Sequence, residues 1–114
     1  MIDITHADYQ VQYDDTHAKV SCKGSFRLNG EEYKPILDLL ILAADATPPL
    51  LTLDVRELQF LNSSGINTLS KLILHVRNKK VSQVLVQGSA KFPWQEKSLI
   101  NLQRLLPALK LEIS

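Results

Sequence analysis

Residues 51–78 read LTLDVRELQFLNSSGINTLSKLILHVRN, and this stretch decides the fold. The chain enters this stretch through Leu50–Val55, a nearly continuous apolar run, which is typical of a strand buried on both faces among parallel neighbours. Residues 56–62 form a short connection. Ser63–Asn78 then places apolar residues three and four positions apart, which predicts a helix with one buried stripe. A strand that leads through a loop into a helix indicates an α/β fold.

Strands and helices alternate on both sides of this segment. Upstream, apolar and polar residues alternate in two short runs, which predict a hairpin of two strands. The predicted elements outside residues 50–78 are strands at Tyr9–Tyr13 and Lys19–Ser25, a helix that follows Glu31 and Glu32 and is stopped by Pro48, a strand at Val81–Gln87, a helix at Ser98–Leu106 and a strand at Leu109–Ile113. The order is therefore β-β-α-β-α-β-α-β, in a mixed sheet with the helices mainly on one face.

Length and charge narrow the class of protein. The chain has 114 residues, which fits a single domain spanning residues 1–114, and we expect residues 1–8 to form a loose end. A net charge of +1 argues against a nucleic-acid partner, which would need clustered Lys and Arg. No basic and apolar leader begins the chain, and the apolar stretch at 36–46 is too short to span a bilayer. One cysteine excludes an internal disulfide, so we expect a cytoplasmic protein without a membrane partner.

The chemistry concentrates at the start of the second helix, in the sequence Asn62-Ser63-Ser64-Gly65. The first N–H groups of a helix have no partner within it, and the side-chain oxygen of Asn62 or Ser63 can cap them. We expect Gly65 to leave the surface beside Ser64 open. A phosphate on Ser64 would meet the positive end of the helix dipole and add about −1.5 to −2 charges, which a docked partner would feel.

The sequence gives little support to a catalytic serine or a metal site. If Ser64 were a nucleophile it would need a base nearby, but His75 lies eleven residues further along the same helix, or about 16 Å. The three histidines have no metal-ligand spacing, and no cofactor motif is present. The simplest alternative for both serines is helix capping. We expect Cys22 to be a core residue.

Asp54 to Ile66, read as D-V-R-E-L-Q-F-L-N-S-S-G-I, resembles the signature of STAS domains of the anti-sigma factor antagonist type. In that family a buried strand ends in Asp, an apolar connection follows, and Asp-Ser-Ser-Gly opens a helix. The element order from Tyr9 to Ile113 is also similar. The wider pattern, including Val-Gln-Gly-Ser and the Pro-Trp-Gln loop, resembles a stand-alone subgroup found in cyanobacteria.

This resemblance implies a non-catalytic regulator that works by partner switching. The unmodified domain binds a GHKL-type serine kinase that acts as an anti-sigma-like protein, the kinase phosphorylates Ser64, and a PP2C-type phosphatase resets the cycle. Ser63 is the less favoured acceptor. Asn62 departs from the family, which has Asp there, and this puts the rate of phosphorylation in doubt. We expect the partner-binding residues to be Asn62, Ser63, Ser64, Gly65, Asp54 and Trp94.

Several alternatives stay open. Asp54 either shapes the loop around Ser64 or is a carboxylate satisfied by nearby backbone. Trp94, in a loop predicted at 89–97, is either a docking aromatic or a residue that packs this loop onto the third helix. The whole domain is either a switch, a scaffold or self-associating module without phosphorylation, or a sensor of a small ligand.

Overall fold

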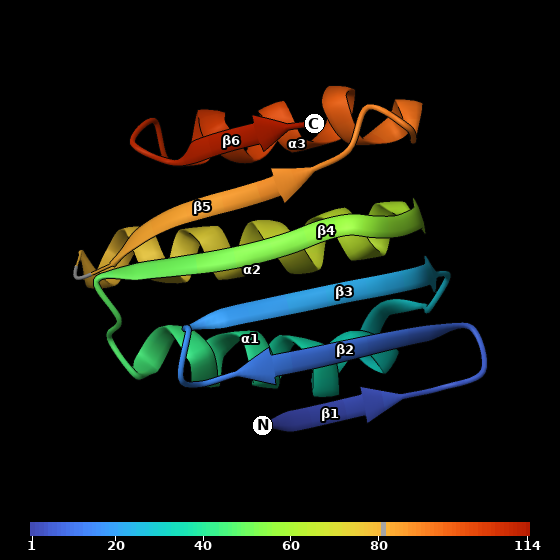
Figure 1. Ribbon diagram of the computed structural model, residues 1–114, viewed down its shortest axis with the longest axis horizontal. Coiled ribbons are helices and arrows are strands. Elements are labelled where there is room, and N and C mark those ends of the chain that lie inside the picture. The colour runs from blue at the N-terminus through green and yellow to red at the C-terminus, as the bar shows by residue number, and fades with distance from the viewer. Residues whose placement is uncertain (81) are drawn as a thin grey trace.

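Three α-helices lie on one face of a six-stranded sheet in the computed structural model, which describes residues 1–80 and 82–114 (Figure 1). The elements are β1 (Ile2–Thr5), β2 (Tyr9–Asp14), β3 (Lys19–Phe26), the 3₁₀ helix η1 (Gly30–Tyr33), α1 (Lys34–Asp45), β4 (Leu50–Leu61), α2 (Ser63–Lys79), β5 (Gln83–Gly88), α3 (Pro93–Leu105) and β6 (Lys110–Ile113). From Tyr9 onward the order of strands and α-helices is the predicted one. Val81, the predicted first residue of the fourth predicted strand, lies outside the described residues.

The strands lie side by side in the order in which they occur in the chain. β1, β2 and β3 are antiparallel, whereas β3, β4, β5 and β6 are parallel. From β3 to β6, each strand lies beside the one before it, on the side away from β2. Right-handed crossovers therefore place α1, α2 and α3 on the same face, as predicted. The parallel strands all end at one edge of the sheet, here called the carboxyl edge, where α2 and α3 begin.

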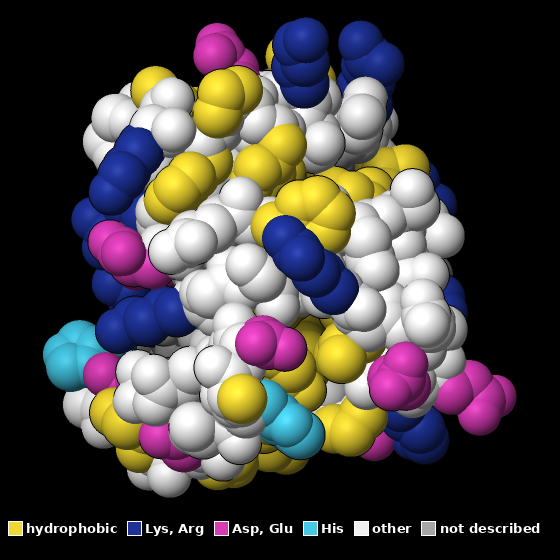
Figure 2. All heavy atoms as spheres, turned by 90° about the vertical axis from the view of Figure 1, so that its right-hand side faces the viewer, with side chains coloured by type: hydrophobic (Ala, Val, Ile, Leu, Met, Phe, Trp, Pro, Cys, Tyr) yellow, Lys and Arg dark blue, Asp and Glu magenta, His cyan; other side chains and the backbone are white. Residues whose placement is uncertain are grey.

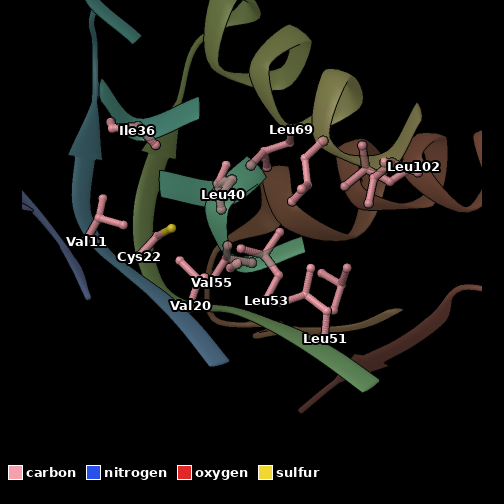
Figure 3. Packing of buried hydrophobic residues seen from close by; sticks show 14 of the residues in the cluster. Val11, Val20, Cys22, Ile36, Leu40, Leu51, Leu53, Val55, Leu69 and Leu102 are labelled. Carbon is pink, nitrogen blue, oxygen red and sulfur yellow. The ribbon is translucent and has the colours of Figure 1, made fainter. Parts of the chain in front are cut away.

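The core lies between the sheet and the helices. Figure 3 shows buried side chains from the strands pointing toward those from the helices. The labelled ones are Val11, Val20, Cys22, Leu51, Leu53 and Val55 on strands, and Ile36, Leu40, Leu69 and Leu102 on helices. Among the described residues, no helix is long and apolar enough to cross a membrane.

β4 corrects one expectation about burial. The prediction that this strand is covered on both faces is wrong, because all three helices lie on one face. Leu51, Leu53 and Val55 face the helices and are buried, while Thr52 and Asp54 point to the other face and are partly exposed. That other face is polar, which suits a sheet surface in contact with water.

The predicted loose end is also wrong, because Ile2–Thr5 forms β1. β1 pairs with β2 in antiparallel register, with Ile4 opposite Val11. On the polar face, the carboxylate of Asp3 accepts hydrogen bonds from the side chains of Gln10 and Gln12. Ile2 and Ile4 alternate with Asp3 and Thr5, but four residues are too few for this alternation to distinguish a strand from a loose end.

Two predicted boundaries shift at the carboxyl edge. β4 continues to Leu61 rather than ending at Val55, and its register against β3 shifts twice near the middle. These irregularities break the alternation of apolar and polar residues, so residues 56–61 look like a loop in the sequence. α3 begins at Pro93 rather than Ser98, because proline fits the first helical turn, where no N–H is needed.

Gln95 holds these irregular segments together. Its side chain is fully buried on α3. Nε2 donates to the carbonyl oxygens of Val55 (2.7 Å) and Leu58 (2.9 Å), and Oε1 accepts from the Ser89 N–H (2.7 Å). One amide therefore satisfies three backbone groups where β4 is irregular and β5 has ended.

We predict that Gln95→Leu lowers the free energy of unfolding by about 2–4 kcal/mol, because it leaves buried backbone groups without partners. Urea unfolding followed by circular dichroism measures the change. Glu96→Gln, at the exposed neighbouring position, is the control and should stay within about 0.5 kcal/mol of the parent protein. Equal stability of the two variants would contradict this role for Gln95.

Candidate functional site

Asn62 links β4 to α2 at the carboxyl edge. Its backbone is extended, and its side-chain Oδ1 accepts from the Gly65 N–H at 2.9 Å, which makes Asn62 the N-cap of α2. The same oxygen accepts from the Tyr33 hydroxyl at 2.6 Å. Nδ2 donates to the Leu28 carbonyl at 2.7 Å. Three hydrogen bonds thus fix the end of β4, the start of α2 and the segment before α1 relative to one another.

The two serines are therefore not needed as caps. Ser63 is exposed and Ser64 is half-buried. Within the described part of the chain, neither hydroxyl takes part in a hydrogen bond, and neither backbone N–H donates one. The capping explanation for Ser63 and Ser64 is wrong, because Asn62 does this work. Ser64 lies on the first turn of α2 with a hydroxyl that has no structural task.

Gly65 has a different role from the expected one. It is buried, so it does not open the surface beside Ser64. A Cβ at this position would overlap the side chain of Leu61 and lie 2.9 Å from the Tyr33 hydroxyl oxygen. Glycine is needed here so that the first turn of α2 can pack closely against β4 and η1.

A groove runs beside Ser64, between η1 and α1 on one side and α2 on the other. It is an open hollow of about 570 Å³. Charged and polar side chains line it, namely Glu31, Lys34 and Asp38 from the first side and Ser64, Asn67 and Lys71 from α2. Lys34 Nζ lies 3.0 Å from Asp38 Oδ2 in an exposed ion pair. Ser64 thus lines a hollow that also holds two lysines, two carboxylates and the apolar side chain of Leu37.

The rest of the carboxyl edge is partly apolar. Figure 2 faces this edge and shows hydrophobic side chains in several patches, separated by single charged side chains. Phe60, near the end of β4, is 39% exposed. The guanidinium of Arg27 lies over its ring, 4.7 Å from the centroid. An exposed aromatic ring at this edge is a feature that protein interfaces favour.

Asp54 is not part of this site. It lies seven residues before the end of β4, or roughly 20 Å along an extended strand, and on the polar face of the sheet. Its carboxylate accepts from the Arg56 guanidinium at 2.8 and 3.0 Å and lies 3.4 Å from Lys19 Nζ. Partial burial raises the pKa of Asp54, but the hydrogen bonds and charges of Arg56 and Lys19 outweigh it and lower the pKa overall. Asp54 is a satisfied carboxylate and does not shape the loop around Ser64.

Trp94 lies on the first turn of α3, not in a loop. Its indole Nε1 donates to the Gln59 carbonyl at 2.9 Å, and the ring packs against the core. Trp94 therefore does not pack a loop onto the third helix as one alternative had it, because it is part of that helix and anchors it to β4; the docking alternative stays a prediction. The side chain is half-buried at the carboxyl edge.

His75 is not in position to act as a base for Ser64. His75 Nε2 lies 2.7 Å from Asp45 Oδ1, so the two residues pair where α1 ends, far from the start of α2. Burial raises the pKa of the Cys22 thiol to about 12, as expected for an unreactive core cysteine. Among the described residues, no three His, Cys, Asp or Glu side chains form a group that could hold a metal ion.

Sequence reasoning missed the groove and two of the residues that build the site. Tyr33 and Leu28 contact Asn62 across 29 and 34 residues of chain. Contacts at such separation leave no periodic pattern in one sequence. A partial signal exists for the groove, since Ser64, Asn67 and Lys71 follow the helical spacing of one face.

Comparisons with protein-family models and with curated proteins found no match. Three chains of solved structures match. One comes from the crystal structure of the diguanylate cyclase SiaD in complex with its activator SiaC from Pseudomonas aeruginosa. It is 16% identical, with a TM-score of 0.71, over 99% of this chain and 98% of that one. A structure of SiaC of Pseudomonas aeruginosa is also 16% identical, with a TM-score of 0.70, over 100% of this chain and 98% of that one. The crystal structure of apo-SiaC from the same organism is 19% identical, with a TM-score of 0.65, over 100% of this chain and 99% of that one. At this identity the likeness shows that the chain has the fold of SiaC.

We predict that Asn62→Ala costs about 2–4 kcal/mol of unfolding free energy, because it removes the cap and leaves Tyr33 and Leu28 without a partner. Ser63→Ala and Ser64→Ala are the matched controls on the same turn, and each should change stability by less than about 0.5 kcal/mol. Urea unfolding of the three variants measures this. A serine variant as damaging as Asn62→Ala would show that the cap is assigned to the wrong residue.

The contacts of Asp54 with Arg56 and Lys19 predict that the stability of the protein depends on pH. A carboxylate with a lowered pKa stabilises the folded state above the pKa of the unfolded chain, about 3.9, and loses this effect as the pH falls through the folded pKa. Asp54→Asn should therefore cost about 1–2 kcal/mol at pH 7 and progressively less below about pH 4. Urea unfolding at several pH values tests this, and a cost that does not change with pH would contradict it.

Proposed function

We propose that this chain is a non-catalytic regulatory protein that binds a protein partner at its carboxyl edge and is switched by phosphorylation of Ser64. The observation that carries the proposal is the assignment of the α2 cap. Asn62 Oδ1 accepts the capping hydrogen bond from the Gly65 N–H, so the Ser64 hydroxyl is available at a helix start without cost to the fold.

The helix start favours the modified state. In the reaction, the γ-phosphoryl group of a nucleoside triphosphate moves to Ser64 Oγ, the hydroxyl proton passes to a base of the kinase, and the nucleoside diphosphate leaves. The product carries about −1.5 to −2 charges close to two unused N–H groups and the positive end of the α2 dipole. We expect the fold to accept this charge, whereas a partner packed on the same surface loses contact with it.

The structural neighbours support a role in binding a partner. SiaC, which has the same fold, is described as the activator of a diguanylate cyclase and is found in complex with it. The resemblance of residues 54–66 to STAS domains supports the finer proposal. In it the partner is a GHKL-type serine kinase that acts as an anti-sigma-like protein, and a PP2C-type phosphatase removes the phosphate.

Asn62 in place of the family's Asp fits this proposal. Its Nδ2 donates to the Leu28 carbonyl, which an ionised Asp could not do. The side chain is half-buried, and its hydrogen bonds are made within the protein. Replacement of the family's Asp by Asn62 therefore changes hydrogen bonds within the protein. It does not change the surface from which a kinase approaches Ser64.

The experiment is intact-mass measurement of the chain after incubation with nucleoside triphosphate and the serine kinase purified with it from its native cells. We expect one added phosphate, which disappears in Ser64→Ala and remains in Ser63→Ala. Ser64→Asp should weaken kinase binding at least tenfold while the circular dichroism spectrum stays the same, since an acid suits the first turn of a helix.

Two results would overturn the proposal. One is a phosphate that persists in Ser64→Ala. The other is a kinase that binds Ser64→Asp as tightly as the parent chain. A chain that self-associates and takes up no phosphate would instead favour the scaffold alternative.

A further inference from the structure

We infer that a phosphate on Ser64 is held in the neighbouring groove by Lys34 and Lys71, and that Lys34 gives up its contact with Asp38 to do so. The inference rests on the proposed function in that it takes Ser64 as the modified residue. It adds where the phosphate goes and which side chains respond to it.

The first support is the arrangement of the two helices. α1 and α2 lie side by side and start near the same edge of the sheet (Figure 1). Lys34 is the first residue of α1, and Ser64 is the second residue of α2. Lys71 is seven residues after Ser64, so both side chains lie on the same face of α2. Both lysines and Ser64 line the same groove.

The second support is the state of the two lysines. Lys34 pairs with Asp38 at 3.0 Å, but both side chains are well exposed. Exposed pairs of this kind contribute little to stability. Lys71 forms no salt bridge with any other residue of the described chain. A phosphate dianion makes stronger charge-assisted hydrogen bonds than a single exposed carboxylate, so both lysines are available to it.

The third support is the space and the balance of charge. The hollow of about 570 Å³ has room for a phosphate beside Ser64 without a shift of the backbone. Lys34 and Lys71 are balanced in the groove by Glu31 and Asp38. When the lysines turn to the phosphate, the carboxylate of Asp38 loses its partner. Phosphorylation therefore changes the surface of α1 as well as the tip of α2.

The test uses the full chain with phosphoserine incorporated at position 64 during translation, so that no kinase is involved. The ³¹P NMR signal of the phosphate is followed against pH in the parent chain and in a Lys34→Gln, Lys71→Gln variant. Two lysines near the dianion should lower the second pKa of the phosphate by about 0.5 relative to the variant. A phosphatase should also remove the phosphate several-fold faster from the variant.

The matched control is the double variant Lys79→Gln, Lys110→Gln. It removes the same charge from two exposed lysines, one at the end of α2 and one at the start of β6. It should titrate like the parent chain. Equal titration midpoints in all three proteins, or equal shifts in both variants, would overturn the inference. Because the phosphate is built in, this result is independent of whether a kinase modifies Ser64, which the intact-mass experiment decides.

Discussion

The side chain of Asn62 is the constraint on which the site depends. Its two polar atoms bond the Gly65 N–H, the Tyr33 hydroxyl and the Leu28 carbonyl, and thereby join three segments that are far apart in the chain. Without these bonds the first turn of α2 would need another cap, and the serines beside it are the nearest candidates. Because Asn62 fills the role, the serine hydroxyls are left at the surface for another use.

The topology explains how this surface is assembled. A sheet whose parallel strands follow one another in sequence sends every helix to the same face. The starts of α2 and α3 and the end of β4 are therefore neighbours at the carboxyl edge. A second amide, the fully buried Gln95, does for α3 and β4 what Asn62 does for α2 and η1. The two amides thus tie the starts of α2 and α3 to the segments around them.

Much of this could be predicted from the sequence, because local patterns carry it. The apolar stripe of α2, the helix start at Ser63 and the mixed sheet all follow from periodicity and spacing. The failures have physical causes. β1 has only four residues, too few for its alternation to stand out, and the irregular half of β4 breaks the alternation. The hydrogen bond from Tyr33 to Asn62 spans 29 residues, so no local pattern encodes it. Asp54 seemed close to Ser64 only because the length of β4 was underestimated.

The most direct test of the account is amide hydrogen exchange, measured residue by residue by NMR in the unmodified chain. If Asn62 alone caps α2, the Gly65 N–H is bonded to its side chain and should exchange at least tenfold more slowly, relative to an unfolded peptide, than the N–H groups of Ser63 and Ser64. Equal protection at all three positions, or protection of the serines with a freely exchanging Gly65, would contradict the account.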